Sequence, residues 1–356
     1  MANSYYQVAT TPKLYVSYPL FQYANGALDS YTTDKGSFSD DNIIKPLQID
    51  PSNQITFPDD VYNYEKFFYK VLPSFDDSNP VDSGLWNFDF YMILGHNFAS
   101  IGSGHNVNIK AYKDTTYKGQ LDITNIVNDC ANGVQCEFDG WSLGQINDIP
   151  DDANTFSFHF NTNTTGYDFN DVKIGSLLFG RSYSFPQNCQ MNTSTVFEYG
   201  VKQKSTISGK TISTANWTKP NNWGTEPFGL TSEGQEGDNF QRRTGRRVWK
   251  MTVDSLAPDK VFPQNMMMND NNYTPQDNHT QGSAENSSLY NINNSEDFYS
   301  SVVHKTLGGH LPMVLQLDQN DTSPSNFAIV RMNKDFKVQQ KSPLLYTYSI
   351  TLTEQI

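Results

Sequence analysis

Two histidines are the first residues of this sequence whose chemistry could build a metal site. His96 lies in the segment Gly95-His96-Asn97, nine residues before His105, and Asn and Gly surround both. No third ligand has a spacing diagnostic of a zinc site, because no cysteine belongs to a C-x-x-C pair. We therefore interpret His96 and Asn97 as part of a polar turn that ends a strand, and the sequence predicts no metal and no cofactor.

The cysteines, Cys130, Cys136 and Cys189, leave two interpretations open. Cys130 and Cys136 could close a small loop around Asn132-Gly133 as a disulfide. An odd number of cysteines argues against a complete disulfide framework. Free thiols in a reducing cytoplasm are therefore the favoured interpretation.

Carboxylates could do hydrolytic chemistry or bind calcium. Asp151, Asp152, Asp168 and Asp171 lie in expected loops, and glycosidases use two carboxyl groups across a cleft, but nothing in the sequence selects a pair. The cluster Asp318–Asp321 lacks the glycine and distal glutamate of the helix–loop–helix calcium motif, so it is interpreted as a solvated turn. Motifs of serine hydrolases, zinc proteases and P-loop enzymes are missing. The sequence predicts that the chain is not an enzyme.

Two tryptophans, Trp141 and Trp223, are candidate ligand-binding residues, because an exposed indole ring can stack on a sugar. The alternative, which we favour, is that each anchors a core or an interface.

The strongest basic run lies before and inside a predicted strand. Basic residues beside an aromatic ring suit nucleic acid, and arginine also pairs with carboxylates on an acidic neighbouring subunit. The net charge of −13 favours the subunit contact over binding of nucleic acid. The other alternative is that these arginines are simply the charged residues at the start of a strand. The four predicted contact residues are Arg242, Arg243, Arg246 and Arg247.

Composition narrows the class of protein. The 356 residues are 13% aromatic and only 18% charged, and Asn, Thr, Ser and Gln supply much of the polarity. This mixture favours strands and turns over long helices. The acidic balance argues against nucleic-acid binding. No apolar run approaches the ~20 residues of a membrane span, and no signal peptide is visible.

The elements that must position these residues are strands. Alternation with period two is clean over residues 107–112 and 155–160, where Phe156, Phe158 and Phe160 share one face. Further expected features are a hairpin about Ser208-Gly209, a strand from Arg247 to Val253, a helix over 297–307 and strands at 313–317, 327–332 and 345–352.

These patterns predict an all-β fold of two β-sandwich or jelly-roll-like domains. Residues 1–83 are expected to form an extended N-terminal arm, 84–185 the first sandwich and 186–356 a second β-rich domain. A long polar loop is expected at 264–296, because this segment has almost no aliphatic residues.

Six short motifs follow one another along the chain: 92–102 (MILGHNFASIG), 180–186 (GRSYSFP), 204–211 (KSTISGKT), 245–251 (GRRVWKM), 308–318 (GGHLPMVLQLD) and 326–332 (NFAIVRM). Together they resemble uncharacterised tail-associated virion proteins of marine tailed bacteriophages. The first of them resembles the first strand of the galactose-binding-like jelly rolls found in such proteins. The resemblance covers roughly residues 84–356 and transfers no catalytic residue.

This resemblance implies a structural component of a bacteriophage virion, in the tail or as a tail-tip or adaptor protein, made in the host cytoplasm. The expected partners are other copies of the chain, other virion proteins and a glycan of the host surface. A carbohydrate-binding, receptor-binding module is the first alternative, and a glycan depolymerase is the second.

Overall fold

The protein is seen here in a computed structural model that describes most of the chain. The predicted polar loop 264–296 lies outside the described residues apart from residues 292, 295 and 296. The structure describes residues 11–25, 30–33, 40–51, 53–57, 64–70, 88–100, 105–113, 115–150, 153, 155–162, 172–186, 190–215, 245–263, 292, 295–323, 326–333 and 336–355.

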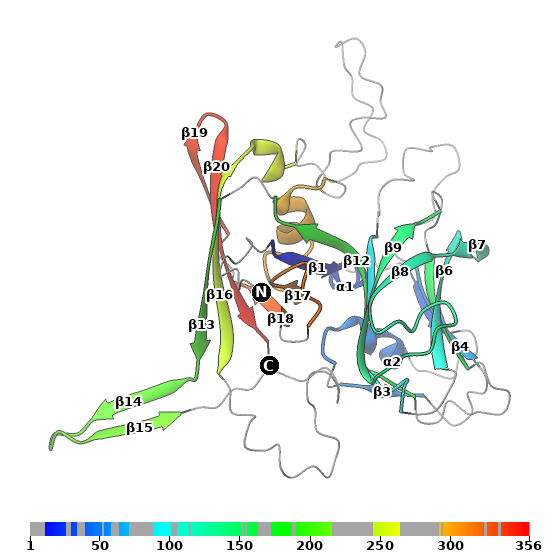
Figure 1. Cartoon of the computed structure of the whole chain (residues 1–356), viewed down its shortest axis with the longest axis horizontal. Helices are drawn as coiled ribbons and strands as arrows, with labels where there is room; N and C mark the ends of the chain where they lie inside the picture. The colour runs from blue at the N-terminus through cyan, green and yellow to red at the C-terminus, as the bar shows by residue number, and fades with distance from the viewer. Residues whose placement is uncertain are drawn as a thin grey trace, which may run out of the picture.

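An eleven-stranded antiparallel sheet crosses the whole molecule (Figure 1). Its strand order is β13–β16–β20–β18–β17–β1–β12–β5–β9–β8, and β19 pairs with β20 beside this path. The strands are β1 (Lys13–Ser17), β5 (Phe90–His96), β8 (Asp122–Val127), β9 (Gly140–Asp148), β12 (Ser176–Ser184), β13 (Gln190–Glu198), β16 (Arg246–Leu256), β17 (Met313–Gln316), β18 (Phe327–Met332), β19 (Lys337–Ser342) and β20 (Leu345–Glu354).

A second sheet of five strands has the order β2–β4–β10–β6–β7, and two further strand pairs stand apart from it. None of the described helices is long and apolar enough to cross a membrane. The strands of the second sheet are β2 (Ser30–Thr33), β4 (Tyr64–Lys70), β6 (His105–Lys113), β7 (Thr116–Gln120) and β10 (Thr155–Thr162). The pairs are β3 (Ile55–Thr56) with β11 (Lys173–Ile174), and β14 (Val201–Ser205) with β15 (Thr211–Ala215). The helical elements are α1 (Tyr18–Ala24), α2 (Asp40–Ile44), η1 (Lys45–Leu47), η4 (Pro258–Lys260) and η5 (Tyr299–His304).

The all-β prediction is confirmed, and the two sheets pack as a β-sandwich. Tyr91 and Ile93 of β5 and Phe179 of β12 point from the large sheet into one apolar core. Phe158 of β10 meets them from the second sheet, with its ring centroid 5.5 Å from that of Phe179. Phe156, Phe158 and Phe160 are buried together, as their spacing predicted.

The opposite face of the large sheet is also buried, because the sheet curls. The alternate residues of β5, Phe90 and Met92, lie in a core that also holds Trp141 of β9 and Phe327 of β18. A third core fills the other half of the sheet, where the ring of Phe298, beside η5, stacks on Tyr348 of β20 with centroids 4.4 Å apart.

The predicted domain layout is wrong at the N-terminus. Residues 1–83 were expected to form an extended arm, yet β1 lies in the middle of the large sheet between β12 and β17, and β4 belongs to the second sheet. The physical reason is that Leu14, Tyr15 and Val16 are all buried, so β1 is apolar on both faces and suits a central strand. One continuous sheet therefore joins the predicted domains 84–185 and 186–356.

Several other elements lie at the positions that the sequence predicts. The predicted hairpin is present as β14–β15, which turns between Thr206 and Lys210. Trp249, Met251 and Val253 of β16 are buried on one face, whereas Lys250 and Thr252 are exposed. The predicted helix over 297–307 contains η5.

Candidate functional site

Strand β13 forms one edge of the large sheet and is almost fully exposed. It pairs with β16 through nine residue pairs, and the strand order of the described residues ends with it. Val196 and Phe197 are 42% and 58% exposed, which is high for apolar side chains on a strand. An edge strand presents unpaired backbone groups to which another strand can add.

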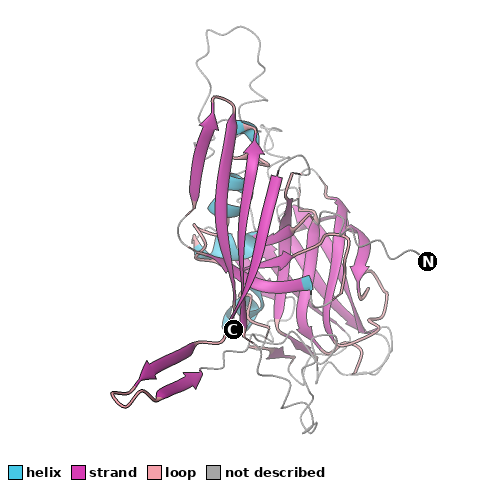
Figure 2. Ribbon diagram, turned by 60° about the vertical axis from the view of Figure 1, so that its left-hand side comes forward, coloured by secondary structure: helices cyan, strands magenta, loops and turns pink. Residues whose placement is uncertain are grey.

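The hairpin β14–β15 continues from β13 and projects away from both sheets, as both views show (Figures 1 and 2). Its side chains from residue 201 to residue 214 are exposed, apart from a partly buried Thr206 at the turn. Val201 and Ile212 are 51% and 54% exposed, and Ile207 at the tip is completely exposed. We call β13 and this hairpin together, residues 190–215, the assembly arm.

The hairpin of the assembly arm has the opposite charge to the rest of the chain. Residues 201–215 contain Lys202, Lys204 and Lys210 and no acidic residue, although the whole chain has a net charge of −13. The hairpin is therefore a basic projection on an acidic chain.

The predicted basic run lies partly before β16 and partly at the start of this strand. Arg242 and Arg243 lie outside the described residues. Arg246 forms an exposed ion pair with Glu198 of β13, at 3.3 Å, at the base of the hairpin, and its role in a subunit contact stays a prediction.

Arg247 has a role inside the chain, and its predicted role as a subunit contact stays a prediction. Its NH2 group lies 2.5 Å from Oε1 of Glu354, and its Nε donates to the same carboxylate. The backbone N–H of Arg247 also donates to Oε2 of Glu354, at 2.9 Å. The guanidinium therefore ties β16 to the C-terminal strand β20, where the Glu354 side chain is only 4% exposed.

The ligand-binding prediction for Trp141 is corrected. The indole is 0% exposed and packs edge to face on Phe327, so it offers no ring face to a sugar. Trp141 of β9 is therefore a core residue. Trp223 lies outside the described residues, so the prediction for it is untested.

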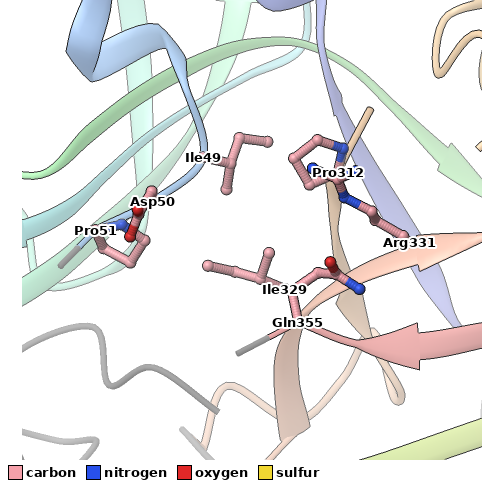
Figure 3. A pocket seen from close by; sticks show the side chains of 7 residues that line it. All are labelled: Ile49, Asp50, Pro51, Pro312, Ile329, Arg331 and Gln355. Atoms are coloured by element: carbon pink, nitrogen blue, oxygen red, sulfur yellow. The ribbon is translucent and has the colours of Figure 1, made fainter. Parts of the chain in front are cut away.

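A shallow cavity of about 150 Å³ lies between the N-terminal segment and the C-terminal strands (Figure 3). Among its lining residues only Asp50 and Arg331 carry charge, and Figure 3 shows them on opposite sides. The lining therefore offers a single carboxylate, and it contains no cysteine, serine, threonine or histidine. Its other lining residues are Ile49, Pro51, Pro312, Ile329 and Gln355.

The acidic turn at 318–321 uses its carboxylates to hold the backbone, as its interpretation as a turn predicted. Oδ1 of Asp318 accepts the N–H of Asn320, at 3.0 Å, and Oδ1 of Asp321 accepts the N–H of Ser323, at 2.8 Å.

A buried cluster inside the sandwich brings together residues that are far apart in the sequence. Nε2 of His96, at the end of β5, lies 2.9 Å from Oγ of Ser142 in β9. The sulfurs of Cys130 and Cys136, in the loop between β8 and β9, lie 3.2 Å and 3.8 Å from the same oxygen. Both cysteines are free thiols, whereas Cys189 and the side chain of His105 lie outside the described residues.

The surroundings hold this cluster in its neutral form. Burial lowers the pKa of His96 to about 4. A hydrogen bond with Cys130, together with burial, raises the pKa of the Cys136 thiol far above its ordinary value. A nucleophilic cysteine requires the opposite shift, so the cluster does not fit thiol catalysis. The ligand atoms of His96, Cys130 and Cys136 all lie within 4.8 Å of one another, which is a spacing that a metal ion could bridge.

Sequence reasoning found His96 but did not connect it with the cysteines, because the three residues share no local spacing. Comparison with known proteins adds no relative: no family model, no curated protein and no solved structure matches the chain.

Proposed function

We propose that this chain is a structural subunit of a multi-copy assembly, and that the assembly is the tail or tail tip of a bacteriophage virion. The observation that supports the proposal is the assembly arm, which exposes apolar side chains on an edge strand and on a projecting hairpin. The virion itself is proposed from the resemblance of the motifs in residues 84–356.

The hairpin needs a partner for a physical reason. An isolated two-stranded hairpin is marginally stable in water. Residues 201–214 bury almost no side chain against the described part of their own chain, so packing there cannot offset the loss of conformational entropy. A neighbouring surface that covers Ile207 and Ile212 would provide that packing.

The partner that fits best is a second copy of this chain. The three lysines of the hairpin have no acidic neighbour within residues 201–215, whereas the whole chain is strongly acidic. The hairpin of one copy would therefore rest on an acidic surface of the next. Such a contact joins different surfaces of the two copies, and repeated contacts of this type form a ring where the rotation closes and a helical filament where it does not.

The test is the oligomeric state of the purified full chain, measured by sedimentation velocity and mass photometry. The triple variant K202E/K204E/K210E is expected to shift the equilibrium to the monomer and to lower the affinity at least tenfold. Raising the salt concentration is expected to dissociate the wild type, because exposed charge pairs are screened.

A matched control changes three exposed lysines on other elements, K173E/K250E/K337E, and keeps the same net charge as the first variant. It is expected to assemble like the wild type. A monomeric wild type at tens of micromolar, or equal loss of assembly in both triple variants, would contradict a contact through the hairpin.

The virion part of the proposal has a separate test. Purified particles of the phage that encodes this chain are analysed by mass spectrometry, and the chain is expected at a fixed copy number per particle. Its presence in infected cells but not in purified particles would rule out a virion role.

A further inference from the structure

The buried cluster of His96, Cys130 and Cys136 carries an inference that does not depend on assembly. The three side chains are 2%, 0% and 4% exposed, and they come from the end of β5 and from the loop that leads into β9. We infer that these three residues bind one Zn²⁺ ion, with Ser142 as the fourth ligand, and that the ion fastens the two sheets of the sandwich together.

The donor set is the first argument. Two cysteine sulfurs and one imidazole are soft and borderline ligands, which select zinc over calcium or magnesium. Two thiolates also cancel the charge of Zn²⁺, so that a loaded site buries no net charge. The imidazole is held in place by Phe98, which stacks on it with centroids 4.6 Å apart.

The geometry is the second argument. Around a tetrahedral zinc, neighbouring ligand atoms lie roughly 3.3–3.8 Å apart, as follows from the usual Zn–N and Zn–S bond lengths. Oγ of Ser142 lies 2.9 Å from Nε2 of His96 and 3.2 and 3.8 Å from the two sulfurs. These distances place the hydroxyl near the fourth corner of a tetrahedron, and contraction of less than about 1.5 Å brings the 4.8 Å cluster to bonding distance.

A buried hydroxyl next to the cluster is the third argument. The hydroxyl of Tyr91 is buried and has no hydrogen-bond partner among the described residues. Tyr91 lies in the same apolar core as Cys130 and Cys136. A neutral thiol is a weak acceptor, whereas a zinc-bound thiolate carries negative charge and is a stronger acceptor for a hydrogen bond from the Tyr91 hydroxyl.

The loop that carries the cysteines is already fixed in shape. Asn128 has a positive φ of 50°, and its side chain donates to the carbonyls of Phe138 and Trp141 while it accepts the N–H of Glu137. These bonds close the loop and hold Cys130 near Cys136. Little ordering entropy then remains to be lost when a metal binds.

The same loop is attached to the second sheet. The carbonyl of Cys130 accepts the N–H of Val107 in β6, and the N–H of Asn132 donates to the carbonyl of Val107, both at 2.7 Å. His96 and Ser142 belong to the large sheet. An ion held by Cys130 and His96 therefore links β6 with β5 and β9, across the interior of the sandwich.

The full chain, purified under reducing conditions, tests this site directly. Metal analysis is expected to find about one zinc per chain. After removal of zinc by a chelator, Co²⁺ is expected to give the thiolate-to-cobalt charge-transfer and intense d–d bands of a tetrahedral site. The double variant C130A/C136A and the variant H96A are expected to lose these bands, while C189A keeps them.

The cobalt spectrum of the wild type tests the site without any variant, so a variant that fails to fold cannot by itself produce the expected result. The variant S142A adds a second reading: it removes only the hydroxyl, and it is expected to bind cobalt with shifted d–d bands and at least tenfold lower affinity. Removing zinc from the wild type is expected to lower its melting temperature, and adding zinc back to restore it.

Three outcomes would overturn the inference. The first is a wild type that binds neither zinc nor cobalt although Cys130 and Cys136 react as free thiols after unfolding. The second is a Cys130–Cys136 disulfide, found by mass spectrometry of the chain isolated under native conditions with thiols blocked. The third is zinc that remains in stoichiometric amount in C130A/C136A.

Discussion

Trp141 of β9 touches Phe327 of β18 edge to face, with ring centroids 4.7 Å apart, although β17, β1, β12 and β5 separate their strands within one sheet. Contact across four intervening strands requires the sheet to curl until β9 and β18 face each other. The concave side then forms its own core, and both rings are fully buried in it. The curl, rather than a second sheet, closes this face.

The first prediction concerns this contact. F327A is expected to lower the free energy of unfolding by about 3–5 kcal/mol, because it leaves a cavity beside Trp141 that the sheet cannot fill. L344A is the control, since Leu344 is 70% exposed between β19 and β20, and it is expected to change stability by less than about 0.5 kcal/mol. Urea unfolding measures both, and equal losses would contradict the proposed packing.

Adjacent arginines on β16 provide the second prediction. R247M is expected to cost about 3 kcal/mol, because it leaves the buried carboxylate of Glu354 without its partner. R246M breaks only an exposed ion pair with Glu198 and is expected to cost less than about 1 kcal/mol. Thermal unfolding of the two variants compares them directly, and a smaller loss in R247M than in R246M would refute the assigned roles.

Gly180 provides the third prediction. A Cβ atom there would lie 2.1 Å from the carbonyl oxygen of Val16, so G180A is expected to push β1 away from β12 and to cost about 1–3 kcal/mol. The control is G119A, whose Cβ would meet no atom closer than 4.0 Å and which is expected to be nearly neutral. The prediction fails if chemical denaturation gives the two variants the same stability.

The fourth prediction concerns pH and Lys305. Burial lowers the pKa of Lys305 from 10.5 to about 7, and its ammonium group lies over the rings of Tyr18 and Phe21, at 5.1 and 4.7 Å. Between these two pKa values the unfolded chain binds a proton that the folded chain does not. The stability contribution of Lys305 therefore rises with pH in this window, by up to about 1.4 kcal/mol per unit, and is lowest below pH 7.

The measurement compares the stability of K305M with that of the wild type at each pH, so that the contributions of other titrating groups cancel. The stability advantage of K305M over the wild type is expected to shrink steadily from pH 7.5 to pH 9.5. The exposed Lys337 provides the control K337M, for which this difference should stay constant. A difference for K305M that is equally flat with pH would show that Lys305 is charged in the folded protein.

The sequence predicted the local elements well, because alternation is a local property. Phe156, Phe158 and Phe160 lie on one face of β10 as expected, and Trp249, Met251 and Val253 do so on β16. The strand order could not be predicted in the same way. Pairing of β1 with β12 and β17 depends on contacts between residues far apart in the chain, which no short window contains.

For the candidate sites the sequence was less informative. Trp141 was a candidate for sugar binding because an exposed indole ring can stack on a sugar, and only the curl of the sheet shows that the ring is enclosed. Cys130, Cys136 and His96 meet only after β5, β9 and their loop have packed, so no spacing rule could group them. The hairpin β14–β15, in contrast, was predicted from its turn residues. The sequence did not predict that it stands apart from both sheets.

The central place of β1 has a consequence for synthesis on the ribosome. Tyr15 donates a hydrogen bond to Gln316, a partner 301 residues later in the chain. At roughly 5–20 residues per second, the first strand leaves the ribosome about 15–60 s before β17 exists to receive it. During that interval the apolar strand has an open side, so in a polysome making many copies at once a neighbouring nascent chain can pair with it.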